Sequence, residues 1–500
     1  MNRLAFALAL FGTLALARAQ AGTLHGDGSL LRDTQNRVVF FHGVNAVWKK
    51  KPYYPPSAVY PTDPAALDAS YFDERDGAFL AANGLNAVRL GALWAGEEAA
   101  AGQPDTSYLD HVEAIVDMLA AHGIAVLLDF HQDMYNEKYA GQGFPDWATI
   151  DDGVPNAPVF GFPGNYFLDP ALFHAFDNLW LDRDGLWAKY GAFWARVAER
   201  FKNKPNLLGY DLLNEPWAGV QWPTCLNPVG CPQFDVLFLQ PFHESAIAAV
   251  REVDVQSPVW WEAQVITDGG AGNNVGLLSP IADPGANQGI SFHVYSLATL
   301  FGSAAPNVLS GPNDPVSALN EDLVFRQQRL AAARNRSALL LSEFGASDSL
   351  DDIGRVTALS DQYLVSWTYW AYGGWGDPTG NAAQEGLFTD DLQRFDAGGN
   401  PQGLKAKADL LVRTYPRAIA GTPRSFAFDP ASKQFTLAYD ADCSIDAPTE
   451  IFVPVARHYG GHYAVSVSGP ASVTSASDAA VLTLQNTGAG MVQVTVTRSP

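Results

Sequence analysis

Basic residues are scarce in this chain. Its 500 residues include 31 Lys and Arg against 53 Asp and Glu, which gives a formal net charge of −22. Nucleic acid and anionic lipid surfaces both repel a protein of this charge, so the composition argues against them as partners. A neutral or glycan-bearing partner fits better.

Cysteine is also rare, with three residues in the whole chain. Cys225 and Cys231 lie in one Pro- and Gly-rich stretch, and they could close a small disulfide loop in an oxidising compartment. Cys443 is left over, and we expect it to be buried and inert. No cysteine pair has the spacing to histidines that a zinc site needs, so no zinc site is predicted.

Long apolar runs are missing after the first twenty residues, so no later segment is expected to cross a bilayer. At the N-terminus, Arg3 precedes the apolar run Leu4–Leu16, and Ala17-Arg18-Ala19 offers a small-x-small cleavage site. This pattern predicts a signal peptide over residues 1–19 and a secreted mature protein. An uncleaved membrane anchor is the alternative.

The chain is long enough for one large domain and a smaller one. Eight strand-like runs, most of them followed by helical spacing, are Val38–Val47, Ala87–Trp94, Ala125–His131, Leu207–Asn214, Val259–Gln264, Gly289–Tyr295, Ala338–Phe344 and Val365–Trp370. Several runs are continuously apolar, as buried parallel strands are. The alternation predicts an α/β fold, a (β/α)₈ TIM barrel over residues 20–422.

The pattern changes after Pro423. Segments such as Gln434–Tyr439, Ala480–Leu484 and Val492–Val496 alternate with period two, and turn residues separate them. We expect a small C-terminal all-β sandwich over residues 423–500.

Two acids close short hydrophobic runs. Glu215 follows Leu207–Asn214, and Glu343 lies near the end of Ala338–Phe344. A carboxylate at the end of a buried strand is costly unless it faces a polar cavity. Two strands of one barrel would therefore aim these acids into one cleft, because the carboxyl ends of the strands share one face. Paired carboxylates are what glycoside hydrolysis needs.

Other polar or aromatic residues occupy the same strand ends. They are Asn45, Arg89, Asp129, His131, Asp133, Asn214, Glu262, His293, Tyr295 and Trp370. A lone histidine is more often structural, but a ring of such residues on most of the strands indicates a site. Glu262 fits either a site residue or a structural acid, and its sequence position does not decide between them.

The connection from residue 132 to 185 is much longer than an ordinary βα loop, which suggests a functional lid or wall. It is rich in aromatic residues, among them Tyr135, Phe144, Trp147, Phe160, Phe162 and Phe167. Two interpretations stay open: a satellite core, or an exposed apolar patch beside the cleft for a lipid or partner.

The motifs Asn214-Glu215-Pro216 and Ser342-Glu343-Phe344-Gly345 resemble the acid/base and nucleophile motifs of glycoside hydrolase family 5. Arg89, His131, Asn214, His293, Tyr295 and Trp370 match the other positions that this family carries. Finer features resemble its endoglycoceramidase branch: Asp129–Tyr135, Leu213–Trp217, the Cys225–Cys231 loop and Arg413–Pro423.

The resemblance implies a retaining β-glycosidase that releases the intact glycan of a glycosphingolipid from ceramide, without metal or cofactor. Glu343 is then the nucleophile and Glu215 the acid/base, with a pKa raised by partial burial and the neighbouring carboxylate. We expect a monomer that meets its substrate at a lipid micelle or membrane surface.

The other site residues receive expected roles. Asn214 would bind the sugar 2-hydroxyl, and His131 and His293 would orient hydroxyls or carboxylates. Trp370 would lie under the ring of the first sugar. Asp133 and Lys49 are candidate sugar contacts, although Lys49 begins the charged run Lys49-Lys50-Lys51, which could simply be solvated.

Alternative functions remain at this stage. They are a family 5 β-glucosidase or glucosylceramidase, an endo-galactosylceramidase-type enzyme, a polysaccharide endo-hydrolase such as a cellulase or mannanase, and an inactive glycan-binding protein.

Overall fold

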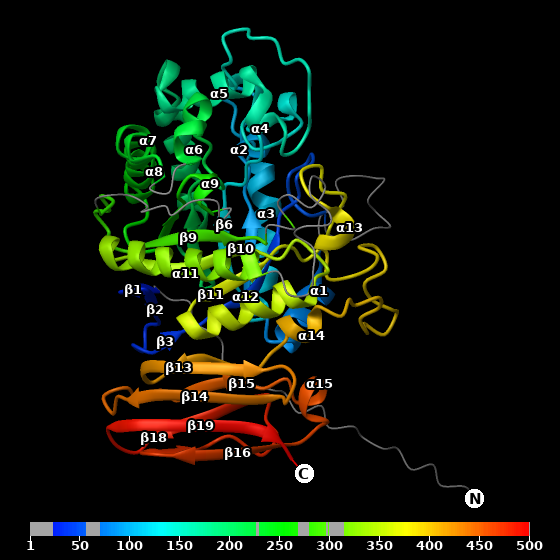
Figure 1. The fold of residues 1–500 in the computed structure, drawn as a ribbon, viewed down its shortest axis with the longest axis vertical. Coiled ribbons are helices and arrows are strands. Elements are labelled where there is room, and N and C mark those ends of the chain that lie inside the picture. The colour runs from blue at the N-terminus through cyan, green and yellow to red at the C-terminus, as the bar shows by residue number, and fades with distance from the viewer. Residues whose placement is uncertain are drawn as a thin grey trace, which may run out of the picture.

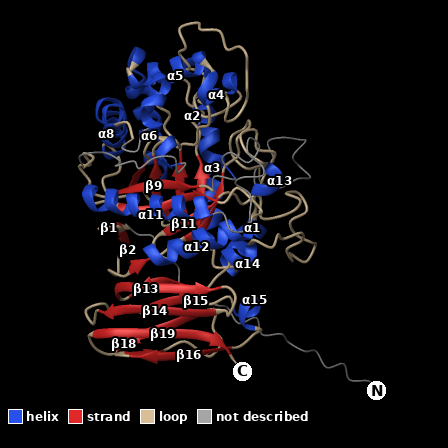
Figure 2. Ribbon diagram, viewed as in Figure 1, coloured by secondary structure: helices blue, strands red, loops and turns tan. Residues whose placement is uncertain are grey.

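The computed structural model describes residues 24–56, 71–226, 230–268, 280–296, 299 and 315–499. The expected signal peptide, residues 1–19, lies outside them. Figures 1 and 2 show two bodies stacked along the long axis: a helix-covered barrel and, below it, a pair of sheets. No helix in the described ranges is both long and apolar enough to span a bilayer.

The first body is the predicted TIM barrel. Its strands are parallel and close in the order β10-β11-β4-β5-β6-β7-β8-β9. Their bounds are β4 His42–Ala46, β5 Ala87–Gly91, β6 Ala125–Asp129, β7 Leu207–Asp211, β8 Val259–Trp261, β9 Gln288–Val294, β10 Ala338–Phe344 and β11 Ser366–Tyr369. All eight lie within or beside the runs expected from the sequence.

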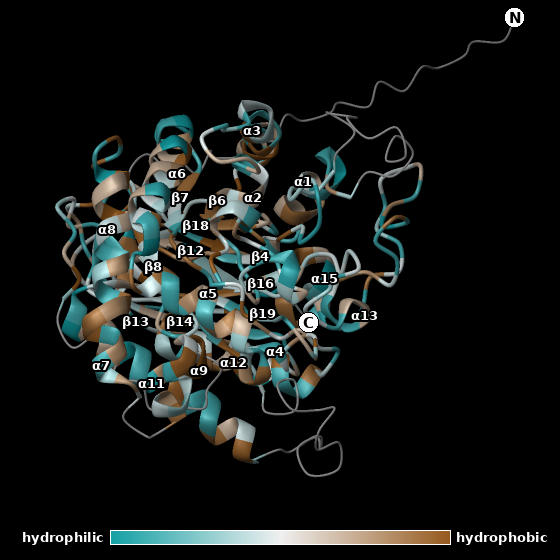
Figure 3. Cartoon of the chain, turned by 90° about the horizontal axis from the view of Figure 1, so that it is seen from above, coloured by the Kyte–Doolittle hydropathy of each residue, from teal (hydrophilic) through white to brown (hydrophobic). Residues whose placement is uncertain are grey.

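Helices surround this barrel, as Figure 3 shows from above. The longer ones are α1 Glu74–Ala82, α3 Thr106–Ala121, α5 Pro170–Trp180, α6 Leu186–Phe201, α8 Gln240–Arg251, α11 Pro315–Asn335 and α12 Leu350–Tyr363. The short ones are α2 Trp94–Glu97, α4 Asn165–Leu168, α7 Pro232–Phe234, α9 Val265–Asp268, α13 Ala382–Glu385 and α14 Ala408–Leu411, whereas α15 Val455–Tyr459 belongs to the second body. Asp105 and Asp169 cap α3 and α5 by accepting backbone N–H bonds, and Pro170 opens α5 where no N–H partner is needed.

Short 3₁₀ helices lie in the long connections: η1 Glu137–Tyr139, η2 Asp146–Ala148, η3 Arg183–Gly185 and η4 Gly219–Leu226. A π-helix, η5 Asp235–Leu239, precedes α8. Of these, η1, η2 and η3 lie between β6 and β7, in the connection that the sequence marked as unusually long. A disulfide joins Cys225, in η4, to Cys231. The expectation that Cys443 is buried is wrong, because this free cysteine follows β14 in a turn and is exposed.

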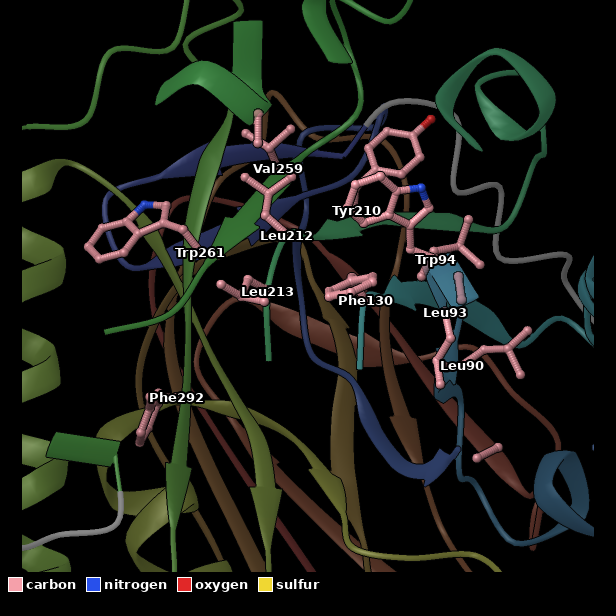
Figure 4. Packing of buried hydrophobic residues seen from close by; sticks show 14 of the residues in the cluster. Leu90, Leu93, Trp94, Phe130, Tyr210, Leu212, Leu213, Val259, Trp261 and Phe292 are labelled. Atoms are coloured by element: carbon pink, nitrogen blue, oxygen red, sulfur yellow. The ribbon is translucent and has the colours of Figure 1, made fainter. Parts of the chain in front are cut away.

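Strand alternation gives the barrel interior two layers. The lower layer is apolar and includes Ala87, Leu127, Trp260 and Leu340. Two positions further along the same strands stand the polar residues Arg89, Asp129, Glu262 and Ser342, all fully buried. Residues of opposite parity, such as Leu90, Trp261 and Phe292, pack outward against the helices (Figure 4). The polar layer is therefore sealed from below and opens only toward the carboxyl ends of the strands.

The second body is a sandwich of two antiparallel sheets, ordered β1-β2-β3-β12-β15-β18-β17 and β13-β14-β19-β16. The strands are β1 His25–Asp27, β2 Leu30–Arg32, β3 Val38–Val39, β12 Tyr415–Ile419, β13 Gly421–Asp429, β14 Gln434–Ala441, β15 Thr449–Phe452, β16 Tyr463–Ser468, β17 Ala471–Val473, β18 Val481–Asn486 and β19 Gly490–Arg498. The sandwich was expected, but two of its boundaries were not.

The expected boundary at residue 423 is too late, because β12 already belongs to the sandwich and Val39 of β3 pairs with Ala418 of β12. The expected first strand, Val38–Val47, is in fact two strands in different sheets: β3 joins the sandwich and β4 joins the barrel. A continuous apolar run predicts that a segment is buried, but it does not show at which residue the chain passes from one hydrophobic core to another.

The two bodies are in direct contact through buried side chains. His42 of β4 is stacked between Trp367 of β11 and Tyr415 of β12, with ring centroids 4.3 and 3.8 Å away. The Tyr415 hydroxyl donates to the carbonyl of Gly84 at 2.6 Å. The sandwich therefore closes the end of the barrel opposite the polar layer.

A substitution at Gly84 can test how closely this interface is packed. It has φ of +72°, and a Cβ there would lie 2.3 Å from the ring of Phe452 in β15. We expect Gly84→Ala to lower the free energy of unfolding in urea by about 1–3 kcal/mol more than Gly123→Ala does. Gly123 is the matched control, since its φ is +69° but no atom lies within 4 Å of its Cβ position. Equal losses in the two variants would show that close packing of Phe452 is unimportant.

Candidate active site

Glu215 and Glu343 face each other at the open end of the barrel. A carboxylate oxygen of each lies within 4.8 Å of the other and of a ring nitrogen of His293. His293 Nδ1 is 2.9 Å from Glu215 Oε1 and 3.6 Å from Glu343 Oε2. The acids that the sequence places at the ends of two distant strands thus share one small space.

A bulge in β10 turns Glu343 inward. The pairing of β10 with β9 shifts between Leu341 and Glu343. Ser342 faces the interior, where its hydroxyl bonds that of Ser291, and Glu343 faces inward as well. Phe344 returns to the outer core. Regular alternation would have pointed Glu343 away from the cleft, so the extra residue is what delivers this acid.

A different irregularity of the backbone places Glu215 in the site. It follows β7 with φ of +46°, in the left-handed region that non-glycine residues rarely adopt. Its backbone N–H donates to Glu262 Oε2 at 2.7 Å, and its carbonyl accepts from Gln132 Nε2 at 2.9 Å. Hydrogen bonds on both sides of the residue offset the conformational cost and fix the direction of its side chain.

Arg89 of β5 is the centre of the polar layer. Its guanidinium contacts the carboxylates of Asp129, Asp211, Glu262 and Glu343 at 2.9, 2.8, 3.0 and 2.6 Å. It also donates to the side-chain oxygens of Asn214 and Asn45, at 2.9 and 3.3 Å. Five fixed donors let one arginine hold groups from several strands at once.

The two acids have different surroundings. Glu343 accepts from Arg89 through Oε1 and from the Tyr295 hydroxyl through Oε2, the latter at 2.7 Å. The pKa of Glu215 is raised by burial and by the charges of Glu343 and Asp133, against the opposing effect of His293. Burial disfavours a charged His293, but Glu343, Glu262 and Glu215 outweigh it and raise the His293 pKa well above its usual value. Both shifts favour the protonated form of the group concerned.

A second group of site residues forms the adjoining wall. Burial opposes charge on His131, yet Asp129 and Asp133 raise its pKa to about 9. Asp133 accepts from Lys49 at 2.8 Å, and Lys49 lies 4.3 Å above the Trp370 ring. Trp370 stacks on His131 with centroids 5.0 Å apart. Lys49 is thus a buried part of the site, whereas Lys51 of the same charged run is exposed.

Every site residue expected from the sequence lies in this contiguous network: Lys49, Arg89, His131, Asp133, Asn214, Glu215, His293, Tyr295, Glu343 and Trp370. Sequence reasoning left other members without a role. Asp129, Asp211 and Glu262 all contact Arg89, and an acid inside or ending an apolar strand was the signal that could have found them. Asp377 and Thr379, which also contact Lys49, come from a loop without any such signal.

The grouping of Glu215, His293 and Glu343 could in principle offer three ligand atoms to a metal ion. Two of these atoms, His293 Nδ1 and Glu215 Oε1, already bond each other at 2.9 Å. The arrangement is that of a proton donor beside a second carboxylate, which fits acid/base work.

A TIM barrel that brings two acids from β7 and β10 together in this way defines a glycosidase. The chain belongs to glycoside hydrolase family 5. The model of the cellulase domain of that family matches residues 69–376, and the model of its C-terminal domain matches residues 413–497. The second match begins close to β12, in agreement with the sandwich boundary described above.

Relatives with this whole architecture are known. Endoglycoceramidase I of Rhodococcus hoagii is 33% identical over 483 residues, which cover 95% of this chain and 88% of that protein. Endo-glycoceramidase II from a Rhodococcus species, solved as a ganglioside GM3 complex, matches with a TM-score of 0.76 and 26% identity, covering 95% of this chain and all of that one. The same enzyme solved as a lactosyl-enzyme intermediate matches with a TM-score of 0.74 and 27% identity, covering 94% of this chain and all of that one.

Proposed function

We propose that this glycosidase is an endoglycoceramidase: it hydrolyses the β-linkage between the glycan and the ceramide of a glycosphingolipid, with retention of anomeric configuration. The observation that carries the retaining chemistry is that a carboxylate oxygen of Glu215 lies within 4.8 Å of a carboxylate oxygen of Glu343. Retaining enzymes hold their acids about 5–5.5 Å apart, whereas inverting enzymes need about 6.5–9.5 Å to admit a water. The similarity to endoglycoceramidases over nearly the whole chain supports the lipid substrate.

The first step forms a covalent intermediate. A Glu343 oxygen attacks the anomeric carbon while the bond from that carbon to the ceramide oxygen breaks, and Glu215 gives its proton to the departing oxygen. The pKa of Glu215 is raised by burial and by the charge of Glu343, which favours the protonated form that this step needs. Ester formation removes the negative charge of Glu343.

The second step returns the enzyme to its starting state. Glu215, now ionised, takes a proton from water, and the water oxygen attacks the anomeric carbon and releases the Glu343 carboxylate. Loss of the Glu343 charge in the ester lowers the pKa of Glu215, because that charge is one of the effects that raise it. The same residue can therefore serve as acid and then as base.

The residues around the acids suit a sugar. Lys49, Asp133 and His131 present charged hydrogen-bonding groups beside the Trp370 ring, and such a combination recognises hydroxyls and the apolar face of a pyranose. Asn214 stands beside Glu215, where its side chain can meet the sugar 2-hydroxyl. We assign this wall to the first sugar of the glycan.

An apolar surface lies on the other side of Glu215. Phe160, Phe162 and Leu168, around α4, are 51, 42 and 55% exposed, and we call them, with Phe167 and Val220, the apolar rim. Phe167 packs against Trp217, two residues after Glu215, and against Trp222. The aromatic residues of the long connection thus divide: Tyr135 and Phe144 are core, and those of the rim are exposed.

The rim is at the end of the molecule opposite the sandwich (Figure 1). We propose that it docks on the lipid surface that presents the glycolipid, because exposed apolar groups next to a cleft gain free energy by leaving water. The negative charge of the chain favours a neutral surface over an anionic one.

Secretion is part of the same proposal. The apolar run after Arg3 and the small residues at Ala17 and Ala19 support a signal peptide, and the Cys225–Cys231 disulfide suits an oxidising compartment. N-terminal sequencing of the exported protein should begin at Gln20. A membrane-bound product that retains residues 1–19 would support an anchor instead.

The substrate class is tested with lactosylceramide in detergent micelles beside glucosylceramide, a cello-oligosaccharide and a manno-oligosaccharide. We expect free lactose from lactosylceramide, first formed as the β-anomer by proton NMR. Glu343→Gln should lower the rate by more than about 10³-fold, since no nucleophile remains, while the exposed Glu199→Gln keeps full activity. Turnover of an oligosaccharide alone would contradict the lipid substrate, and α-lactose as the first product would contradict retention.

The rim is tested by replacing Phe160 and Phe162 together with serine. The kcat/KM for lactosylceramide in phosphatidylcholine vesicles should fall about tenfold, because half-buried aromatic contacts with lipid are lost. The kcat/KM for a soluble aryl β-lactoside should not change. Met491→Ser is the matched control, an exposed apolar residue of β19 in the sandwich. A fall of equal size on both substrates would mean that the rim supports the fold and not docking.

A further inference from the structure

Glu262 contacts several residues of the site, and none of the roles assigned above explains why it is there. It follows β8 directly and is fully buried. Its Oε2 accepts the backbone N–H of Glu215 at 2.7 Å, and its Oε1 accepts from Arg89 Nη2 at 3.0 Å. The same Oε1 lies 3.4 Å from His293 Nε2. One carboxylate therefore connects residues of β5, β9 and the end of β7.

We infer that Glu262 is a positioning residue that holds Glu215 in the geometry for proton transfer. The inference rests on the acid/base role proposed for Glu215. Glu262 acts through two contacts, the Glu215 backbone and the His293 ring, and it touches neither the substrate nor the reacting atoms.

The backbone contact matters because Glu215 is held at a positive φ. Such a conformation persists only where the surroundings fix it. Gln132 holds the carbonyl of Glu215, and Glu262 holds its N–H. Without the Glu262 carboxylate, this N–H would be left facing a cavity, and the turn that aims the Glu215 side chain would relax.

The ring contact acts on the other end of Glu215. His293 lies between two acids, with Nδ1 at 2.9 Å from Glu215 Oε1 and Nε2 facing Glu262. Around His293 and Glu262, the other polar or charged neighbours in the described part of the chain include Glu343, at 3.6 Å from His293 Nδ1, Tyr295 beside the ring, and Arg89. They also include Asp211, which feels the charge of Glu262, and His243, whose Nε2 donates to the Glu262 carbonyl at 2.9 Å. The charge of the carboxylate that faces Nε2 at 3.4 Å therefore favours the ring orientation in which Nδ1 meets Glu215.

Arg89 depends much less on Glu262. Its guanidinium retains Asp129, Asp211, Glu343 and Asn214 as partners if Glu262 is changed. Loss of the Glu262 carboxylate should consequently disturb the proton donor more than the nucleophile. This difference makes the role of Glu262 measurable, because only poor leaving groups need a proton.

The test compares two soluble substrates, 2,4-dinitrophenyl β-lactoside and phenyl β-lactoside. Dinitrophenolate leaves unaided, and phenolate leaves more readily with a proton. In Glu262→Gln we expect kcat/KM for the phenyl substrate to fall about 30-fold, within the usual range for proton-transfer catalysis, and that for the dinitrophenyl substrate to fall less than about threefold. Glu262→Asp, whose carboxylate is drawn back by one methylene, should show the same selectivity and serves if Glu262→Gln does not fold.

Asp211→Asn is the matched control. Asp211 is an equally buried acid on Arg89, and in the described part of the chain its side chain bonds Arg89 and Ser291. Its loss should lower kcat/KM for both substrates by the same factor. The inference is overturned if Glu262→Gln also lowers both equally, or lowers neither.

A wrong assignment of Glu215 as the acid would be recognised by a different result from a wrong assignment of Glu262. Glu215→Gln should show the same leaving-group selectivity as Glu262→Gln, only larger, and its absence there would refute the acid role of Glu215 itself. Because neither aryl substrate carries a lipid, the test of Glu262 stands even if the wild-type enzyme does not act on lactosylceramide.

Discussion

The polar layer of this barrel depends on one guanidinium. Asp129, Asp211, Glu262 and Glu343 come from different strands, and their negative charges could not share a sealed interior without Arg89 among them. Removing one partner of a buried ion pair typically costs about 3–5 kcal/mol, and Arg89 is the partner of four. Even with Arg89 present, burial and the charges of Glu262 and Asp129 raise the pKa of Asp211 to about 7. Arg89 therefore only partly compensates the negative charges of the buried acids. Its contacts with Glu343, Glu262 and Asn214 help to place both Glu343 and Glu215.

Glu215 and Glu343, the acids proposed to be catalytic, reach the cleft through departures from regular structure. A regular β10 would have turned Glu343 outward, and a regular backbone after β7 would have aimed Glu215 elsewhere. The fold supplies the platform, since the apolar layer below and the closed barrel hold the strand ends rigidly. Local irregularities then place the reactive atoms, and hydrogen bonds from Gln132 and Glu262 maintain them.

The sequence was informative where the signal is periodic and weak where it is not. Apolar runs and helical spacing were enough for the barrel, and acids or histidines at strand ends were enough for the residues around Glu215 and Glu343. The bulge at Glu343 could not be predicted, because it changes the direction of a side chain without changing the composition of the strand. Asp377 and Thr379 meet Lys49 only through the path of a loop that has no repeating pattern.

The passage of residues 38–46 from one sheet to another bears on how the chain is made. Val39 of β3 pairs with Leu31 of β2 and also with Ala418 of β12, so the second neighbour of β3 becomes available only after the barrel sequence between them has been synthesised. Until then, β3 presents an unpaired edge, and the lower end of the barrel lacks the stack of His42 on Tyr415. Closure of the sandwich therefore joins strands from before and after the barrel. A cut at residue 423 would leave β3 and β12 on the barrel without the rest of the sandwich, and their apolar residues Val38, Tyr415 and Ile419 would lose their packing partners.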